Sequence, residues 1–142
     1  MISRQSLLLV ATLLHAAMCF AGTVPEVTPE YGSYGDGIAR ERIQPANGRD
    51  AAYVGHALPD GRLLLGGVSS QLGTAATSRF AFLRLTAQGQ RDPSFGIGGS
   101  GSFVLDIAAV GEMTAMSTTS SGKILFAGSN QQHTGIVGKV GE

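Results

Sequence analysis

An internal repeat of 61 residues constrains the fold of this chain more than any other feature of its sequence. The run Asp60–Gly67, DGRLLLGG, returns 61 positions later as Ser121–Gly128, SGKILFAG. The pair Tyr34-Gly35 returns as Phe95-Gly96 at the same distance. Two separated motifs at one spacing indicate tandem copies of a single structural unit, each burying its apolar face against its neighbour. The sequence therefore predicts a repeat architecture.

The local pattern within each copy is typical of strands, because no window places apolar residues at helical spacing over the length of a helix. Asp-Gly at 60–61 and its counterpart Ser-Gly lie between apolar runs, which is a strong hairpin signal, and we expect a two-residue turn with positive φ at both residues. The runs LLL, FAFL and ILFA are continuous, as in sheets covered on both faces. We expect strands at residues 38–43, 51–58, 62–69 and 79–86 of the first copy and at 102–108, 113–119, 123–129 and 135–140 of the second.

Four short antiparallel strands per copy, stacked copy on copy, are the anatomy of a propeller blade. The predicted fold class is all-β, with two four-stranded antiparallel propeller-blade-like repeats, at about 34–94 and 95–142, that form an incomplete propeller in one chain. Aligning FAFLRL with GIVGKV reduces the offset from 61 to 55. The loop before the last strand is therefore six residues shorter in the second copy, and loops tolerate such changes at low cost.

Residues 1–21 have the three-part pattern of a secretory signal peptide. Arg4 precedes an apolar run at 6–20, and Cys19-Phe20-Ala21 supplies the small residues of a cleavage site. The run is too short to span a bilayer, so we expect cleavage after Ala21 and a periplasmic or secreted bacterial protein. Residues 22–33 hold two prolines and are expected to form an extended lead-in. A retained N-terminal anchor and a lipoprotein acylated at Cys19 are the alternatives.

Composition excludes several classes of partner. The 142 residues include ten Lys and Arg, ten Asp and Glu, and one cysteine. Cleavage after residue 21 would remove Arg4 and Cys19, leaving nine basic residues against ten acidic ones and no possible disulfide. A nearly neutral surface without a basic cluster argues against nucleic acid and against stable insertion into an anionic membrane. An exported domain without disulfides depends on its core and on assembly.

The segment RLTAQGQRDPSFGIGG at 84–99, together with the hairpins DGRLLLGG and SGKILFAG, resembles the delta-60 repeat family of bacterial exported proteins. Asp60-Gly61 and Ser121-Gly122 match the hairpin of that family, although Ser121 replaces its Asp. Arg84-Leu85, Gly89, Asp92, Phe95-Gly96 and Gly98-Gly99 match its closing segment. The resemblance covers residues 34–140 and implies a β-propeller-like fold. It implies no activity, because the family has no common catalytic residues.

Few residues suggest chemistry. Asp36 and Asp92 lie in Gly-rich loops where oxygen ligands could hold Ca²⁺, but Asp92-Pro93 is also a turn signal whose carboxylate accepts backbone N–H bonds. His56 and His133 occupy non-equivalent places in the two copies, without further zinc ligands at suitable spacing. The serines lack a G-x-S-x-G motif, and the Gly-rich run from Ser94 lacks the Lys-Ser/Thr ending of a phosphate loop. The sequence therefore predicts no catalytic, cofactor-binding or metal-binding residue, and no cofactor.

Other residues are expected to serve the framework. Arg84 and Lys139 hold equivalent places, and Arg84 is expected to pair with an acidic neighbour such as Asp106, although a cation here could also line a ligand surface. Five phenylalanines are expected to form the hydrophobic core rather than a platform on which sugar rings stack; they are Phe80, Phe82, Phe95, Phe103 and Phe126.

Two blades cannot close a propeller, and open ends expose strand edges. We therefore expect a homo-oligomer or a complex with another repeat protein, for instance a ring of roughly six to eight blades. The expected function is an exported, non-catalytic scaffold or binding module whose loops, such as 67–78 and 129–135, contact the ligand. An enzyme with its site at the axis of an oligomeric ring is one alternative. A truncated relic of a longer repeat array is another.

Overall fold

The computed structural model of the chain describes residues 28–43, 48–71, 78–107 and 110–141. The expected signal peptide and residues 22–27 of the lead-in lie outside these ranges. The elements are β1 (Gly48–Ala57), β2 (Leu63–Gln71), β3 (Arg79–Leu85), the short 3-10 helix η2 (Ile97–Gly99), β4 (Ser102–Val104), β5 (Val110–Thr118), β6 (Ile124–Asn130) and β7 (Gly135–Val140). In the described part of the chain, no helix is both long enough and apolar enough to cross a membrane.

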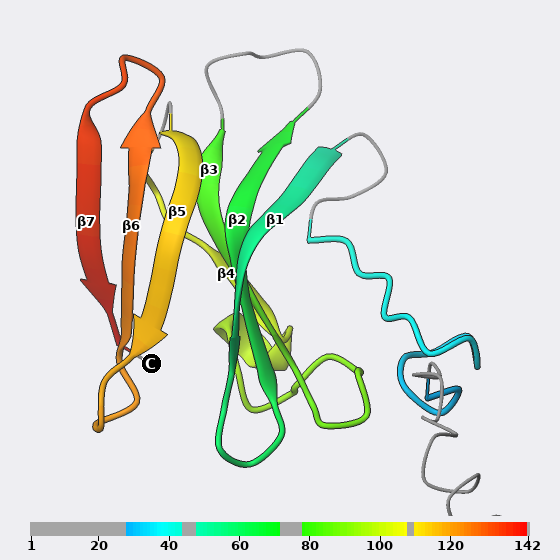
Figure 1. The fold of residues 1–142 in the computed structure, drawn as a ribbon. Coiled ribbons are helices and arrows are strands. Elements are labelled where there is room, and N and C mark those ends of the chain that lie inside the picture. The colour runs from blue at the N-terminus through cyan, green and yellow to red at the C-terminus, as the bar shows by residue number, and fades with distance from the viewer. Residues whose placement is uncertain (1–27, 44–47, 72–77, 108–109, 142) are drawn as a thin grey trace, which may run out of the picture.

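The strands form two antiparallel sheets (Figure 1). Sheet A has the order β1-β2-β3-β4, and sheet B has the order β5-β6-β7. Each sheet is a meander in which neighbours in sequence are neighbours in space. The fold is therefore all-β, and two open sheets of four and three strands are consistent with incomplete propeller blades.

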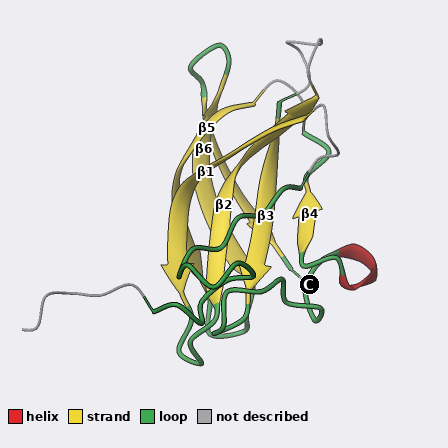
Figure 2. Cartoon of the chain, turned by 90° about the vertical axis from the view of Figure 1, so that its right-hand side faces the viewer, coloured by secondary structure: helices red, strands yellow, loops and turns green. Residues whose placement is uncertain are grey.

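Two of the expected strands differ from the structure. Residues 38–43 form no strand, so that prediction is wrong. The strand expected at 102–108 is the shorter β4, and it pairs with β3 of the first copy, placing Phe103 opposite Phe82. Residues 38–43 pair with none of the described strands, so no ladder of backbone hydrogen bonds holds them in an extended conformation. The segment 38–43 instead lies across the outer face of sheet A (Figure 2).

The other six predicted strands are confirmed, with bounds that agree within three residues. The hairpin turn at Asp60-Gly61 is confirmed as a turn, but its type was predicted wrongly. The N–H of Leu58 donates to the Arg62 carbonyl at 2.8 Å, so three residues form the loop. Only Gly61 among them has positive φ, at 86°. A three-residue loop that ends in a left-handed residue is a common alternative to the two-residue turn.

The same irregularity recurs in both sheets at the repeat spacing. The pairing of β1 with β2 shifts register between Ala52 and Val54, and the pairing of β5 with β6 shifts between Met113 and Ala115, 61 positions later. A β-bulge of this kind bends the strand and increases its twist. The two sheets therefore share their curvature as well as their strand order.

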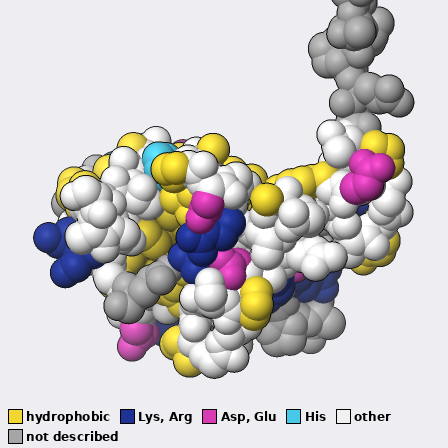
Figure 3. Space-filling view, turned by 90° about the horizontal axis from the view of Figure 1, so that it is seen from below, with side chains coloured by type: hydrophobic (Ala, Val, Ile, Leu, Met, Phe, Trp, Pro, Cys, Tyr) yellow, Lys and Arg dark blue, Asp and Glu magenta, His cyan; other side chains and the backbone are white. Residues whose placement is uncertain are grey.

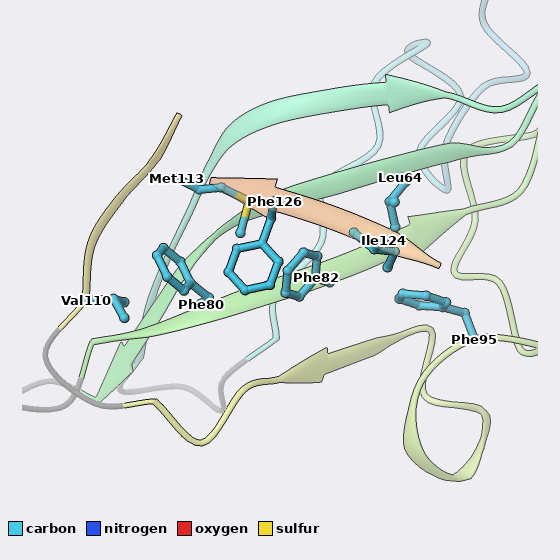
Figure 4. Packing of buried hydrophobic residues seen from close by; sticks show 8 residues of the cluster. All are labelled: Leu64, Phe80, Phe82, Phe95, Val110, Met113, Ile124 and Phe126. Atoms are coloured by element: carbon cyan, nitrogen blue, oxygen red, sulfur yellow. The ribbon is translucent and has the colours of Figure 1, made fainter. Parts of the chain in front are cut away.

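The core lies between the two sheets (Figure 4). Its fully enclosed members come from both copies of the repeat and are Leu64, Phe80, Phe82, Phe95, Val110, Met113, Ile124 and Phe126. Phe126 of sheet B meets Phe80 and Phe82 of sheet A edge to face, with ring centroids 5.3 and 5.4 Å apart. Phe103 stacks on Phe82 at 4.9 Å. The predicted aromatic core is confirmed, and because each sheet has one apolar face in it, neither sheet is covered without the other.

Candidate functional site: the cleft between the sheets

A cleft of about 480 Å³ opens between the two sheets at the end of the molecule where the β1–β2 and β5–β6 turns lie. The β1–β2 turn and β3 contribute Arg62 and Arg84 to its walls. The end of β5 and the turn after it contribute Thr118, Thr119 and Ser120. Figure 3 shows this end of the molecule, with basic and acidic side chains gathered in the middle of the face. The cleft is therefore the place where polar groups from both copies of the repeat converge.

Arg84 is held in place by the turn that follows β3. The N–H of Thr86 donates to the Gln90 carbonyl at 2.7 Å, so the chain folds back on itself. This reversal brings Asp92 beside Arg84, whose Nε donates to the carboxylate at 2.8 Å. The guanidinium lies 4.5 Å from the centre of the Phe95 ring. Both charged side chains are buried, so the pair belongs to the wall of the cleft and is largely removed from water.

Asp92 is the centre of this arrangement. One carboxylate oxygen accepts from both the N–H and the hydroxyl of Ser94, at 2.9 and 2.7 Å. The other oxygen also accepts from Arg62, at 3.0 Å. Burial raises the pKa of Asp92, but the hydrogen bonds from Ser94, Arg62 and Arg84 outweigh it and hold that pKa well below its ordinary value. The carboxylate is therefore ionised at any physiological pH, which agrees with its interpretation as a turn residue.

Arg62 connects the buried pair to solvent. It also binds Asp60 in the β1–β2 turn at 2.8 Å, and its side chain is partly exposed. Hydrogen bonds from Arg62 lower the pKa of Asp60. The carboxylates of Asp60 and Asp92 in turn raise the pKa of Arg62. Two arginines and two aspartates balance in formal charge. The cleft therefore offers a neutral surface whose ionic groups are engaged with each other and with the turns.

Thr118 and Thr119 of the cleft wall bind polar groups that lie beside the cleft. His56 on β1 lies 3.1 Å from the Thr118 hydroxyl on β5, so the two connect the sheets. The Thr119 hydroxyl accepts from the N–H of Lys123 in the β5–β6 turn at 3.1 Å. Hydroxyls beside a balanced ion network suit contact with polar uncharged groups better than they suit proton transfer.

The remaining candidates from the sequence are scattered. Asp36 is exposed, accepts from Arg40, and caps the N–H of Ile38 at 3.1 Å. Hydrogen bonding from Arg40 lowers its pKa. His133 lies in the β6–β7 turn, away from His56. Among the residues that the structure describes, no three His, Cys, Asp or Glu side chains gather in a way that could hold a metal ion.

Arg84 pairs with an acidic residue, as expected, but the prediction that this residue is Asp106 is wrong. Asp106 binds Arg79 at 3.2 Å on the surface, whereas Arg84 binds Asp92. Asp106 follows β4, which lies along β3 and carries the chain toward the other end of that strand. A signal for the true partner was present, since Gly89 lies between Arg84 and Asp92 and permits the reversal that joins them.

Comparison with known proteins adds one match. Residues 58–95 match the family model described as "Domain of unknown function (DUF5122) beta-propeller". The matched segment resembles a β-propeller repeat. It runs from the β1–β2 turn to Phe95 and so contains the whole Asp60, Arg62, Arg84 and Asp92 network. No curated protein and no solved structure matches the chain.

Proposed function

We propose that the chain is an exported, non-catalytic module of the delta-60 repeat type, which serves as a scaffold or binding unit. The observation that carries this proposal is that the charged residues of the cleft are engaged in contacts that stabilise the fold. Arg84, Asp92 and Arg62 are bound to each other and to turn residues, so they hold the β-propeller framework together. The match to a β-propeller family model supports a binding or scaffold module of that kind.

Binding in this proposal uses the loops and the cleft beneath them. The β6–β7 loop at 131–134 is described, whereas residues 72–77 of the loop expected at 67–78 lie outside the described ranges. Thr119 and Ser120 lie in the β5–β6 turn beside the cleft. Polar uncharged groups, such as the hydroxyls of a saccharide or the amides of a peptide, are the chemistry this lining suits.

Export is tested by expressing the whole chain in a bacterium with two membranes and fractionating the cells. The proposal expects the protein in the periplasm or the medium, with the mass of residues 22–142. Recovery in the cytoplasm with residues 1–21 attached would overturn the export part of the proposal.

Absence of catalysis is tested with chromogenic esters, glycosides, phosphates and peptides. The proposal expects no turnover above that of a His56→Ala variant at any protein concentration. Turnover that rises with assembly and disappears in His56→Ala or Asp106→Asn would favour the alternative of an enzyme with its site at a ring axis.

A further inference from the structure

Because β1–β3 of sheet A and β5–β7 of sheet B are copies of one repeat, the residues of these strands have equivalent positions. Each face of sheet A therefore has an equivalent face on sheet B. Leu85 and Val140 lie opposite the first residues of β2 and β6, Leu63 and Ile124, which are themselves 61 positions apart. The register therefore confirms that β3 corresponds to β7 with an offset of 55. The face of sheet A that lies in the core corresponds to the outer face of sheet B.

The outer face of sheet B carries exposed counterparts of residues that are buried in the core of the described structure. Phe82, Leu64 and Phe95 are at most 1 % exposed. On the outer face of sheet B, the counterparts of Phe82 and Leu64 are Val137 and Leu125, which are 84 and 40 % exposed. The counterpart of Phe95 is Tyr34, which lies before β1, outside sheet B, and is 70 % exposed. Exposed apolar residues grouped on one face indicate an interaction surface.

The edge of sheet B next to β7 is also incomplete. In sheet A the corresponding edge, that of β3, is covered by β4, with Phe103 opposite Phe82. Among the described residues, no strand lies beside β7 on that side. Subtracting the repeat spacing of 61 from β4 gives residues 41–43, the part of the chain that forms no strand of its own.

We propose that a second copy of the chain docks head to tail on sheet B. Its residues 41–43 add to the free edge of β7 as a fourth strand, with Arg42 opposite Val137. The outer face of its sheet A stacks on the outer face of sheet B, which is formed by Ala115, Ser117, Leu125, Ala127, Val137 and Lys139. This inference deepens the proposed scaffold role and rests on it.

The intramolecular contact between the sheets supplies the template for every part of this interface. β4 joins β3, and the chain then crosses to β5, whose sheet packs on sheet A. Residues 41–43 likewise lead, through 44–47, into β1. Arg84 lies against the Phe95 ring, and the corresponding pair between copies is Lys139 with Tyr34. The contact between sheet A and sheet B within one chain is thus repeated between neighbouring chains. Such a contact is a heterologous interface, which closes into a ring or extends as a filament.

In the single chain, the segment to be exchanged pairs with none of the described strands, and the N–H of Ile43 donates to the Asp50 carboxylate at 2.8 Å. Residues 39–43 cover part of the outer face of sheet A and leave a hollow of about 200 Å³ above Leu65, Ala81 and Leu83. Glu41 binds Arg91 at 2.6 Å, and Arg91 also donates to the Arg42 carbonyl. In the assembly, sheet B of the neighbouring copy takes the place of this segment over sheet A.

Disulfide trapping tests the proposed register. The whole chain is expressed with Cys19→Ala, so introduced cysteines are the only ones whether or not the leader is removed. An Arg42→Cys chain is mixed with a Val137→Cys chain, because facing residues in neighbouring strands have Cα atoms within disulfide reach. The control mixture uses Ser117→Cys, which lies on the same face but two strands away, roughly 10 Å from β7. The proposal expects a covalent dimer in the first mixture and its loss in the control.

A chain carrying both Arg42→Cys and Val137→Cys reports the size of the assembly. A ladder of covalent multimers that ends at a fixed number indicates a ring, and an open-ended ladder indicates a filament. Either ladder supports the head-to-tail contact. Equal crosslinking in the Val137→Cys and Ser117→Cys mixtures, or a monomer mass by light scattering at every concentration, would overturn it.

A charge on the docking surface provides a second test. Val137→Asp is expected to reduce the assembly to monomers and to leave the circular dichroism spectrum unchanged. Ile97→Asp is the matched control, because Ile97 is equally exposed and lies outside the proposed interface. Assembly that survives Val137→Asp would overturn the inference. An exported, non-catalytic monomer would contradict this inference alone, and turnover by a crosslinked assembly would contradict the proposed function alone.

Discussion

Asp92 is the residue on which the ion network of the cleft depends. Asp92→Asn preserves the shape of the side chain but removes the buried carboxylate that Arg84 binds at 2.8 Å. Removing one partner of a buried ion pair costs about 3–5 kcal/mol, so we expect a loss of that order in the free energy of unfolding. Urea titration followed by circular dichroism measures it. Asp60→Asn, at the exposed end of the network, is the control, and equal losses in both variants would contradict this assignment.

The lowered pKa of Asp92 also predicts how stability depends on pH. The unfolded chain binds a proton at Asp92 near the ordinary value of 3.8, whereas the folded chain binds it only at lower pH. The carboxylate therefore contributes its full stabilisation above about pH 4, and this contribution falls as the pH decreases toward the folded pKa. We expect the free energy of unfolding of the native chain to drop more steeply below pH 4 than that of Asp92→Asn. Parallel curves would show that other groups dominate acid unfolding.

His133 is the one described residue other than glycine with positive φ, at 61°. Its turn has the hydrogen bonds of the 58–62 turn, with the N–H of Asn130 donating to the Thr134 carbonyl at 2.9 Å, and His133 takes the place of Gly61. A left-handed conformation costs roughly 1–2 kcal/mol for a residue with a Cβ. We expect His133→Gly to raise the midpoint of thermal unfolding and His133→Ala to leave it unchanged. A gain in the alanine variant would mean that the imidazole itself is unfavourable.

At the scale of strands, the repeated bulge depends on a glycine in the facing strand. A Cβ on Gly128 would collide with the Glu112 carbonyl oxygen and the Phe80 ring, and a Cβ on Gly67 would collide with the Ala51 carbonyl in the equivalent place. We expect Gly128→Ala to cost about 1–3 kcal/mol, as overpacking does elsewhere. Gly135→Ala is the control, because nothing lies within 4 Å of a Cβ there. Chemical denaturation of the two variants measures the difference.

The sequence pattern located strands better than it located their partners. Apolar runs and hairpin signals are local, so β2, β3, β6 and β7 could be predicted closely. Pairing of β4 with β3 depends on which edge is open, and that property belongs to the assembled sheet. The same limit applied to the candidate site. Arg84 was recognised as a framework cation, but the choice of Asp92 over Asp106 depended on a chain reversal at Gly89.

At the scale of the whole molecule, the single core predicts cooperative unfolding of both sheets. Phe126 is the side chain of sheet B that contacts the two most buried aromatic rings of sheet A. Phe126→Ala is expected to cost about 3–5 kcal/mol, as truncations of buried phenylalanine do. Circular dichroism and tyrosine fluorescence should follow one shifted transition. Two separate transitions would show that sheet A is stable without sheet B.

The position of β4 determines how duplication adds repeats to a chain of this kind. The strand begins the second copy of the repeat in sequence, yet it completes the sheet of the first. A duplication of 61 residues thus copies one strand of an existing sheet together with the strands of the next. Each added copy is joined to the preceding copy by backbone hydrogen bonds between strands as well as by packing of the sheets. The number of units can change in whole steps without a new kind of contact, and a proteolytic cut at 96–101 would leave the two halves bound through the paired backbones of β3 and β4.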